Sequence, residues 1–162
     1  MNKTKQIAGL MLSLLIAFGV ASLGRLFTDL SVSTWYTTLV KPAWTPSGAT
    51  IGTVWTILYT SMGIAAWIVW RRGGVAVRRG PLGIYAIQLL LNAGWSALFF
   101  GLRSPGLALL EIVLLWLAIL ATLSIFLRVS RLAALLMLPY LVWVGFAAVL
   151  NALIWTLNST TG

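Results

Sequence analysis

Indole, phenol and amide side chains are the groups in this sequence best suited to chemistry, because it contains neither histidine nor cysteine. Their absence removes the commonest general base, the thiol nucleophile and the usual soft metal ligands. We therefore predict no metal site. Trp, Tyr, Asn and Gln remain, and they can stack on a flat ligand and exchange hydrogen bonds with it. The side-chain inventory favours ligand binding over acid–base or nucleophilic catalysis.

Three apolar stretches carry these side chains on one face of a helix, since residues at i, i+3 or i+4, i+7 and i+11 lie together. The three stripes are Trp55, Tyr59, Met62 and Ala66; Gln88, Asn92, Trp95 and Phe99; and Tyr140, Trp143, Ala147 and Asn151. An amide facing lipid is costly, so Gln88, Asn92 and Asn151 are expected to point inward. For any single aromatic residue, helix–helix packing is the simpler interpretation.

The composition indicates an integral membrane protein. Of the 162 residues, 60% are hydrophobic and 8% are charged, and Asp29 and Glu111 are the only acids beside 11 Lys and Arg. Soluble domains carry about 25% charged residues. Apolar runs long enough to cross a bilayer predict five spans, at 7–27, 51–70, 82–101, 107–127 and 132–157. We expect a single all-α domain over residues 1–162, a five-transmembrane-helix bundle.

Prolines refine the expected helices. Pro81 and Pro105 precede the third and fourth spans, and proline is typical of the first helical position, where its missing N–H costs nothing. Pro139 lies inside the fifth span and predicts a kink there. We therefore expect helices to start at Pro81 and Pro105.

Lysine and arginine are unevenly shared between the two ends of this expected bundle. One end carries eight of them and the other carries Arg25, Lys41 and Arg103; the eight are Lys3, Lys5, Arg71, Arg72, Arg78, Arg79, Arg128 and Arg131. Because cytoplasmic loops hold the excess of positive charge, we expect a cytoplasmic N-terminus and an extracytoplasmic C-terminus. Short clusters between apolar runs also argue against a nucleic-acid-binding face.

The first span has a second interpretation. Lys3 and Lys5, followed by an apolar stretch and Gly19-Val20-Ala21, resemble a signal peptide with its cleavage site. The apolar run continues to Phe27, however, and small residues recur every four positions at Gly9, Ser13, Ala17 and Ala21, as in closely packed membrane helices. We favour a retained first span.

The connection 28–50 is long and rich in aromatic side chains. It contains Trp35, Tyr36 and Trp44, together with Pro42 and Pro46. Connections of this length are usually functional or disordered, and this composition argues against disorder. An interfacial aromatic belt is the alternative, above all for Trp44. At about 1.5 Å per residue, the three stripes reach the same depth beneath this loop. We expect a ligand pocket there, in the outer half of the bundle, with 28–50 as its lid.

The same residues carry a family resemblance. Trp35-Tyr36, Lys41-Pro42-Ala43-Trp44-Thr45-Pro46 and Trp55 resemble the loop and second-helix signature of the translocator protein family (TspO/MBR), whose bacterial members are called tryptophan-rich sensory proteins. Asn92-Ala93-Gly94-Trp95-Ser96 with Phe99-Phe100-Gly101 is similar to the third-helix motif. Pro139-Tyr140-Leu141-Val142-Trp143 and Phe146-Ala147-Ala148-Val149-Leu150-Asn151 are similar to the fifth-helix motif.

This resemblance implies a five-helix bundle, often a homodimer, with a pocket for porphyrins, related tetrapyrroles and synthetic benzodiazepine-type ligands. By residue match, Trp55, Asn92 and Trp143 would form hydrogen-bonding walls. By the same match, the site would be completed by Trp35, Tyr36, Phe99 and Ala147. Trp95 is added because it lies on the same helical stripe as Asn92 and Phe99. No obligatory cofactor is expected, with porphyrin as the ligand. Cholesterol binding, as in mitochondrial relatives, is not expected, because residues 150–162 contain no Tyr, Lys or Arg.

Three functions stay open on this basis. The favoured one is membrane-embedded binding and sensing of porphyrin-like molecules. The second is light-dependent porphyrin degradation, reported for some members, which needs electron-rich indoles such as Trp55 and Trp143 rather than His or Cys. The third is transport. Proton-coupled carriers usually keep an ionisable residue deep in the membrane, and Glu111, the sole candidate, is interpreted instead as a helix-start residue near Arg103.

Ala93, Ala97 and Gly101 form a stripe of small residues on the third span. Such stripes let membrane helices approach closely. The stripe predicts either a contact with a second copy or the packing of a neighbouring helix within the monomer.

Overall fold

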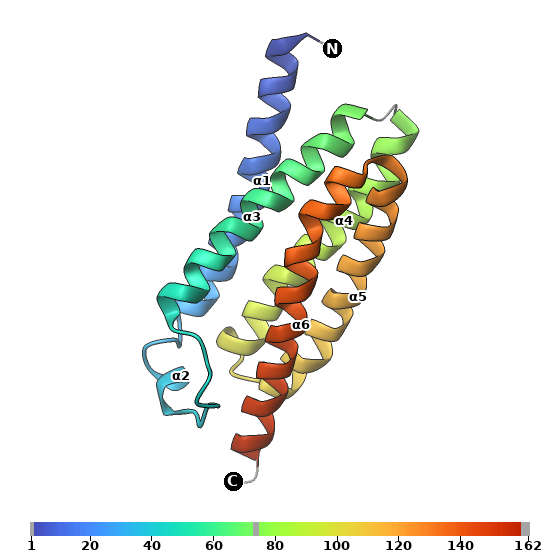
Figure 1. The fold of residues 1–162 in the computed structure, drawn as a ribbon. Coiled ribbons are helices and arrows are strands. Elements are labelled where there is room, and N and C mark those ends of the chain that lie inside the picture. Colours follow the sequence, from blue (N-terminus) through green and yellow to red (C-terminus); the bar gives the residue numbers. More distant parts are fainter. Residues whose placement is uncertain (1, 73–74, 160–162) are drawn as a thin grey trace.

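The computed structural model describes residues 2–72 and 75–159, apart from the side chains of 75–78. Every regular element among them is helical (Figure 1). Five helices are long and apolar enough to cross a membrane. Helices suit this setting, since the bilayer core offers no water to satisfy backbone N–H and C=O groups. The predicted all-α membrane bundle is confirmed.

The five long helices contain the five predicted spans and extend beyond them. They are α1 (Lys3–Asp29), α3 (Gly48–Arg72), α4 (Val75–Ser96), α5 (Pro105–Val129) and α6 (Arg131–Ser159), and α4 runs on into a π-helical turn, η1 (Ala97–Gly101). Pro105 is the first residue of α5 and Pro139 lies inside α6. α1 passes without a break through Gly19-Val20-Ala21, the cleavage site of the alternative, signal-peptide interpretation.

The expected helix start at Pro81 is wrong. α4 begins at Val75, so Pro81 lies within the helix. Charged residues at the end of a membrane helix can place their charged groups in the interface while the backbone remains helical. Hydropathy alone does not detect this helical extension beyond the apolar span. Residues 73–74 and the side chain of Arg78, which belong to the predicted basic gap, lie outside the described part.

The five helices form a closed ring. α1 packs against α3 and α4, α3 against α6, α6 against α5, and α5 against α4. The start of α1 and the end of α6 lie at opposite ends of the bundle (Figure 1). The start of α1, the end of α3, the start of α4 and the α5–α6 connection share one end; α2 and the end of α6 share the other. The eight basic residues of the predicted cytoplasmic side therefore belong to segments at one end.

Contacts between α1 and α3 are close in the half of the bundle that contains the N-terminus. A Cβ added at Gly63 would come within 3.2 Å of the Leu14 backbone. The indole of Trp67 donates a hydrogen bond to the carbonyl of Gln6 at 3.0 Å. Toward the other end of the bundle, a Cβ added at Gly48 or Gly52 of α3 would meet nothing within 4 Å. The two helices are therefore tightly packed at one end and loosely packed at the other.

The connection between α1 and α3 is shorter than the predicted 28–50 and is partly helical. It covers 30–47 and includes the short helix α2 (Trp35–Thr38). The Ser31 hydroxyl donates to the Phe100 carbonyl at 2.7 Å. Asn158 of α6 accepts from the Val40 N–H at 3.0 Å and donates to the Val40 carbonyl at 2.9 Å. These bonds fasten the connection to α4–η1 on one side and to α6 on the other.

Candidate ligand pocket

A cavity of about 950 Å³ lies inside the ring of helices, at the α2 end. This volume is at the upper end of the range found for small-molecule sites. Seven of the eight predicted site residues line it: Tyr36, Trp55, Asn92, Trp95, Phe99, Trp143 and Ala147. They come from the connection, α3, α4–η1 and α6, so the ring brings together stripes that are far apart in the sequence.

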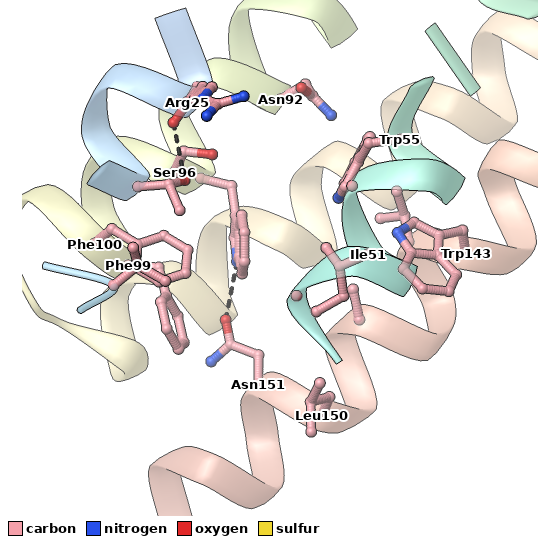
Figure 2. A pocket seen from close by; sticks show the side chains of 18 of the residues that line it. Arg25, Ile51, Trp55, Asn92, Ser96, Phe99, Phe100, Trp143, Leu150 and Asn151 are labelled. Carbon is pink, nitrogen blue, oxygen red and sulfur yellow. Dashed lines mark hydrogen bonds between the residues drawn. The ribbon is translucent and has the colours of Figure 1, made fainter. Parts of the chain in front are cut away.

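Trp55 and Trp143 present unpaired donors to the cavity. Both side chains are half-buried, and within the described residues neither indole N–H makes a hydrogen bond. The Trp55 ring packs 5.4 Å from that of Tyr59, and the Trp143 ring 5.2 Å from that of Phe146. Figure 2 shows the two indoles across the cavity from Phe99 and Phe100. A flat ligand between these walls would meet aromatic faces and two free N–H groups.

Asn92 is held by two phenols. The Tyr59 hydroxyl donates to its carbonyl oxygen, and its amide nitrogen donates to the Tyr140 hydroxyl at 2.9 Å. All three side chains are buried. This network joins α3, α4 and α6, so the Asn92 amide works first as an interhelical tie. The resemblance implies that Asn92 also forms hydrogen bonds with a ligand, and any such bond would have to coexist with those to Tyr59 and Tyr140.

Trp95 also ties helices together. Its indole donates to the Asn151 side-chain oxygen at 3.0 Å, and the Asn151 amide donates to the Pro105 carbonyl at 2.8 Å. The Trp95 ring stacks on Phe99 with 5.1 Å between centroids. Phe99 is only 2% exposed. Gln88, Asn92 and Asn151 are all buried, as predicted.

Trp35 is the predicted site residue that does not line the cavity. Its ring packs edge-on against Phe99 at 5.7 Å, behind the wall. The neighbouring Tyr36 does reach the cavity and packs on Phe100 at 5.5 Å. Burial raises the pKa of the Tyr36 phenol above its ordinary value, because the ionised form loses hydration. Tyr36 is therefore a neutral side chain that can donate or accept a hydrogen bond.

Three charged side chains line the mouth of the cavity: Arg25 and Asp29 of α1 and Lys41 of the connection. The Lys41 ammonium is occupied by contacts within the connection: it donates to the Tyr36 and Leu39 carbonyls at 2.7 and 2.9 Å and lies over the Tyr36 ring. Arg25 is 81% exposed and forms a 3.4 Å ion pair with Asp29. Exposed ion pairs of this kind are weak, so the Arg25 guanidinium can exchange Asp29 for an anionic ligand.

The interpretation of Glu111 as a helix-start residue is wrong. It lies in the second turn of α5, not at its start, and is 9% exposed. Neither carboxyl oxygen has a hydrogen-bond partner within the described residues. The Gln88 amide and the Tyr85 hydroxyl are also buried without a hydrogen-bond partner there. Glu111 follows the buried Ala108 by three residues and precedes the buried Ile112 by one, so it lies on the inward face of α5. Its neighbours on both sides in the sequence are apolar, so periodicity carries no signal for this burial.

The stripe of small residues at Ala93, Ala97 and Gly101 packs at least in part against a helix of the same chain. A Cβ at Gly101 would lie 3.3 Å from the Phe27 ring of α1. η1, which contains Ala97 and Gly101, also packs against α1. Of the two interpretations of this stripe, packing of a neighbouring helix therefore has direct support.

Comparison with known proteins agrees with this architecture. The model of the TspO/MBR family matches residues 11–156. The chain belongs to the TspO/MBR family. It is 46% identical over 162 residues to the tryptophan-rich protein TspO of Chlorobaculum tepidum, covering 98% of this chain and 99% of that protein. It is 40% identical to the TspO protein of Archaeoglobus fulgidus, over 98% and 100% of the two chains.

A human member is similar over a shorter stretch. The translocator protein of Homo sapiens is 41% identical over 126 residues, which cover 76% of this chain and 75% of that one. TspO/MBR membership and the five apolar helices together establish a multi-pass integral membrane protein in contact with lipid. The resemblance drawn from the tryptophan motifs is confirmed.

Proposed function

We propose that this TspO/MBR protein binds porphyrins and related tetrapyrroles in the cavity at the α2 end and acts as a membrane-embedded sensor of them. The observation that carries the proposal is the pairing of two unsatisfied indoles, Trp55 and Trp143, on the wall of a 950 Å³ aromatic cavity. A macrocycle offers a large apolar face for stacking and polar atoms for the two N–H groups. Benzodiazepine-type ligands, which are smaller and flat, would occupy part of the same space.

Charge at the mouth supports an acidic ligand. Porphyrins of biological origin carry carboxylate side chains, and Arg25 is the exposed cation beside the cavity. A macrocycle held between the two indoles on one wall and Phe99 and Phe100 on the other would leave its carboxylates at this rim, where water and lipid headgroups meet the bundle. Arginine suits them, because its planar fork matches a carboxylate.

Titration of the purified protein in lipid nanodiscs tests this assignment, with tryptophan quenching as the readout. Protoporphyrin should bind at one saturable site per chain. Arg25→Gln should weaken protoporphyrin by about threefold and leave its dimethyl ester unaffected, because the ester has no charge to lose. Arg103→Gln is the matched control, since Arg103 is exposed at the same end and does not line the cavity. Equal losses for acid and ester would contradict recognition by charge.

Light-dependent degradation is the second candidate, favoured by the position of two oxidisable indoles on the cavity wall. The same nanodisc sample distinguishes the two functions under illumination in air. Decay of the porphyrin absorbance to one defined product, dependent on Trp55 or Trp143, would establish catalysis. Bleaching that is unchanged when both are replaced by phenylalanine would leave binding as the function.

We also infer a cytoplasmic N-terminus, an extracytoplasmic C-terminus and a homodimer. The orientation is supported by the eight basic residues at one end of the bundle, and reporters that place residue 162 and the α3–α4 connection on one side would contradict it. The family resemblance supports the dimer, and a monomeric mass in nanodiscs would exclude it.

A further inference from the structure

The cavity has an opening on its side. Four of its lining residues are exposed at the seam between two helices: Ser22 and Arg25 of α1, and Gly52 and Thr56 of α3. Residues that both line a cavity and remain exposed mark a place where the wall is incomplete. The seam closes only deeper in the bundle, where Phe18 of α1 meets Tyr59 of α3 with 6.3 Å between ring centroids.

This opening faces the bilayer. Thr56 lies eight residues into α3, which corresponds to about 12 Å from the helix start. Ser22 lies seven residues before the end of α1, a depth of about 10 Å. These depths are well below the connection 30–47, and exposed leucines such as Leu23 and Leu26 flank Ser22 on α1. The seam therefore opens toward lipid chains.

At Ser22 and Thr56, the two deeper positions of the seam, the rim presents no polar barrier to an apolar molecule. The Ser22 hydroxyl donates to the Phe18 carbonyl and the Thr56 hydroxyl to the Gly52 carbonyl, each at 2.9 Å and each within its own helix. A hydroxyl satisfied in this way needs neither water nor a ligand partner. By contrast, the route through the connection passes a segment fastened by hydrogen bonds of the Ser31 and Lys41 side chains and of the Val40 backbone.

We propose that the ligand enters and leaves sideways from the bilayer, through the seam between Ser22 of α1 and Thr56 of α3. The ligand class is a flat amphiphile that dissolves in the membrane: its apolar body passes the seam while its anionic group stays at the interface beside Arg25, which lies across the cavity from Trp55 and Trp143 (Figure 2). This inference rests on the proposed function. It adds that the source of the ligand is the membrane rather than the aqueous phase beyond α2.

Single cysteines test the route, because the chain contains none of its own. Thr56→Cys and Ser22→Cys are placed separately in nanodisc-embedded protein and modified with N-cyclohexylmaleimide. Thr53→Cys is the matched control: Thr53 is also exposed and also bonds within its helix, at the Ala49 carbonyl, but does not line the cavity. Thr45→Cys blocks the competing route, because Thr45 lines the cavity from the connection. Stopped-flow tryptophan quenching with protoporphyrin gives both rate constants.

A blocked entrance slows entry and exit together. Modification at Ser22→Cys or Thr56→Cys should lower the association and dissociation rate constants by about tenfold each, with Kd nearly unchanged, and modification at Thr53→Cys should change neither. Three results would overturn the route. They are unchanged rate constants after modification at both seam positions, a higher Kd without slower dissociation, and slowing only after modification at Thr45→Cys. Failure of the thiols at both seam positions to react would also overturn it, because the seam would then be covered. If unmodified protein fails to bind protoporphyrin, the proposed function fails as well, whereas normal binding with unchanged rates contradicts the route alone.

Discussion

Trp143→Ala is expected to weaken protoporphyrin binding by about 2–4 kcal/mol, roughly 30-fold to 1,000-fold, while leaving the melting temperature close to that of the wild type. The indole is half-buried on the cavity wall and its N–H has no partner within the described residues. Its removal therefore deletes stacking surface and a donor without breaking a helix–helix tie. Trp143→Phe keeps most of the ring and should cost about 1 kcal/mol, chiefly the lost hydrogen bond.

Trp95→Ala is the control for this prediction. Trp95 also lines the cavity, but its indole bonds Asn151 at 3.0 Å and its ring stacks on Phe99. Its loss should lower the melting temperature clearly. Affinity and melting temperature are measured on the same samples. If Trp143→Ala melts as early as Trp95→Ala and still binds protoporphyrin as the wild type does, Trp143 is a packing residue and its place in the site is wrong.

Asn92→Leu is expected to destabilise the bundle by about 1–3 kcal/mol, a large effect for one side chain of similar volume. Leucine removes the acceptor of the Tyr59 hydroxyl and the donor to the Tyr140 hydroxyl, so two buried phenols lose their partner. An unsatisfied buried polar group keeps its full desolvation penalty. The measurement is thermal unfolding of the ligand-free protein in nanodiscs.

A double-mutant comparison gives this prediction its control. Tyr59→Phe alone should cost little, and in the Asn92→Leu background it should recover stability, because it removes one of the stranded hydroxyls. If Asn92→Leu melts as the wild type does and loses protoporphyrin affinity, the amide contacts the ligand and the interhelical tie is unimportant.

The number and extent of the spans could be predicted because a membrane requires apolar stretches of a set length. The inward direction of Gln88, Asn92 and Asn151 followed from the cost of an amide in lipid. Helical spacing then brought most site residues to the cavity. Composition and periodicity thus carry much of the fold, because the bilayer leaves few alternatives to a helix.

Other features depend on packing that no local pattern contains. Trp35 and Tyr36 are adjacent and similar, and both rings pack on Phe99, yet only Tyr36 lines the cavity. Glu111 was assigned to a helix start by its position near Arg103, whereas α5 begins at Pro105 and buries the carboxyl. The open seam depends on α1 being next to α3 and on their separation toward the α2 end, which the order of spans in the sequence does not give.

Filling the cavity tests the central claim most directly. Ala147 of α6 lines the cavity, whereas Val149, two residues on, is 56% exposed on the outer face of the same helix. Protoporphyrin affinity is measured for Ala147→Phe and Val149→Phe in nanodiscs, together with their melting temperatures. We expect Ala147→Phe to raise Kd by at least about tenfold, because the added ring occupies the space of the macrocycle, and Val149→Phe to bind as the wild type does. Equal affinities for a folded Ala147→Phe protein and the Val149→Phe protein would mean that porphyrin does not bind in this cavity.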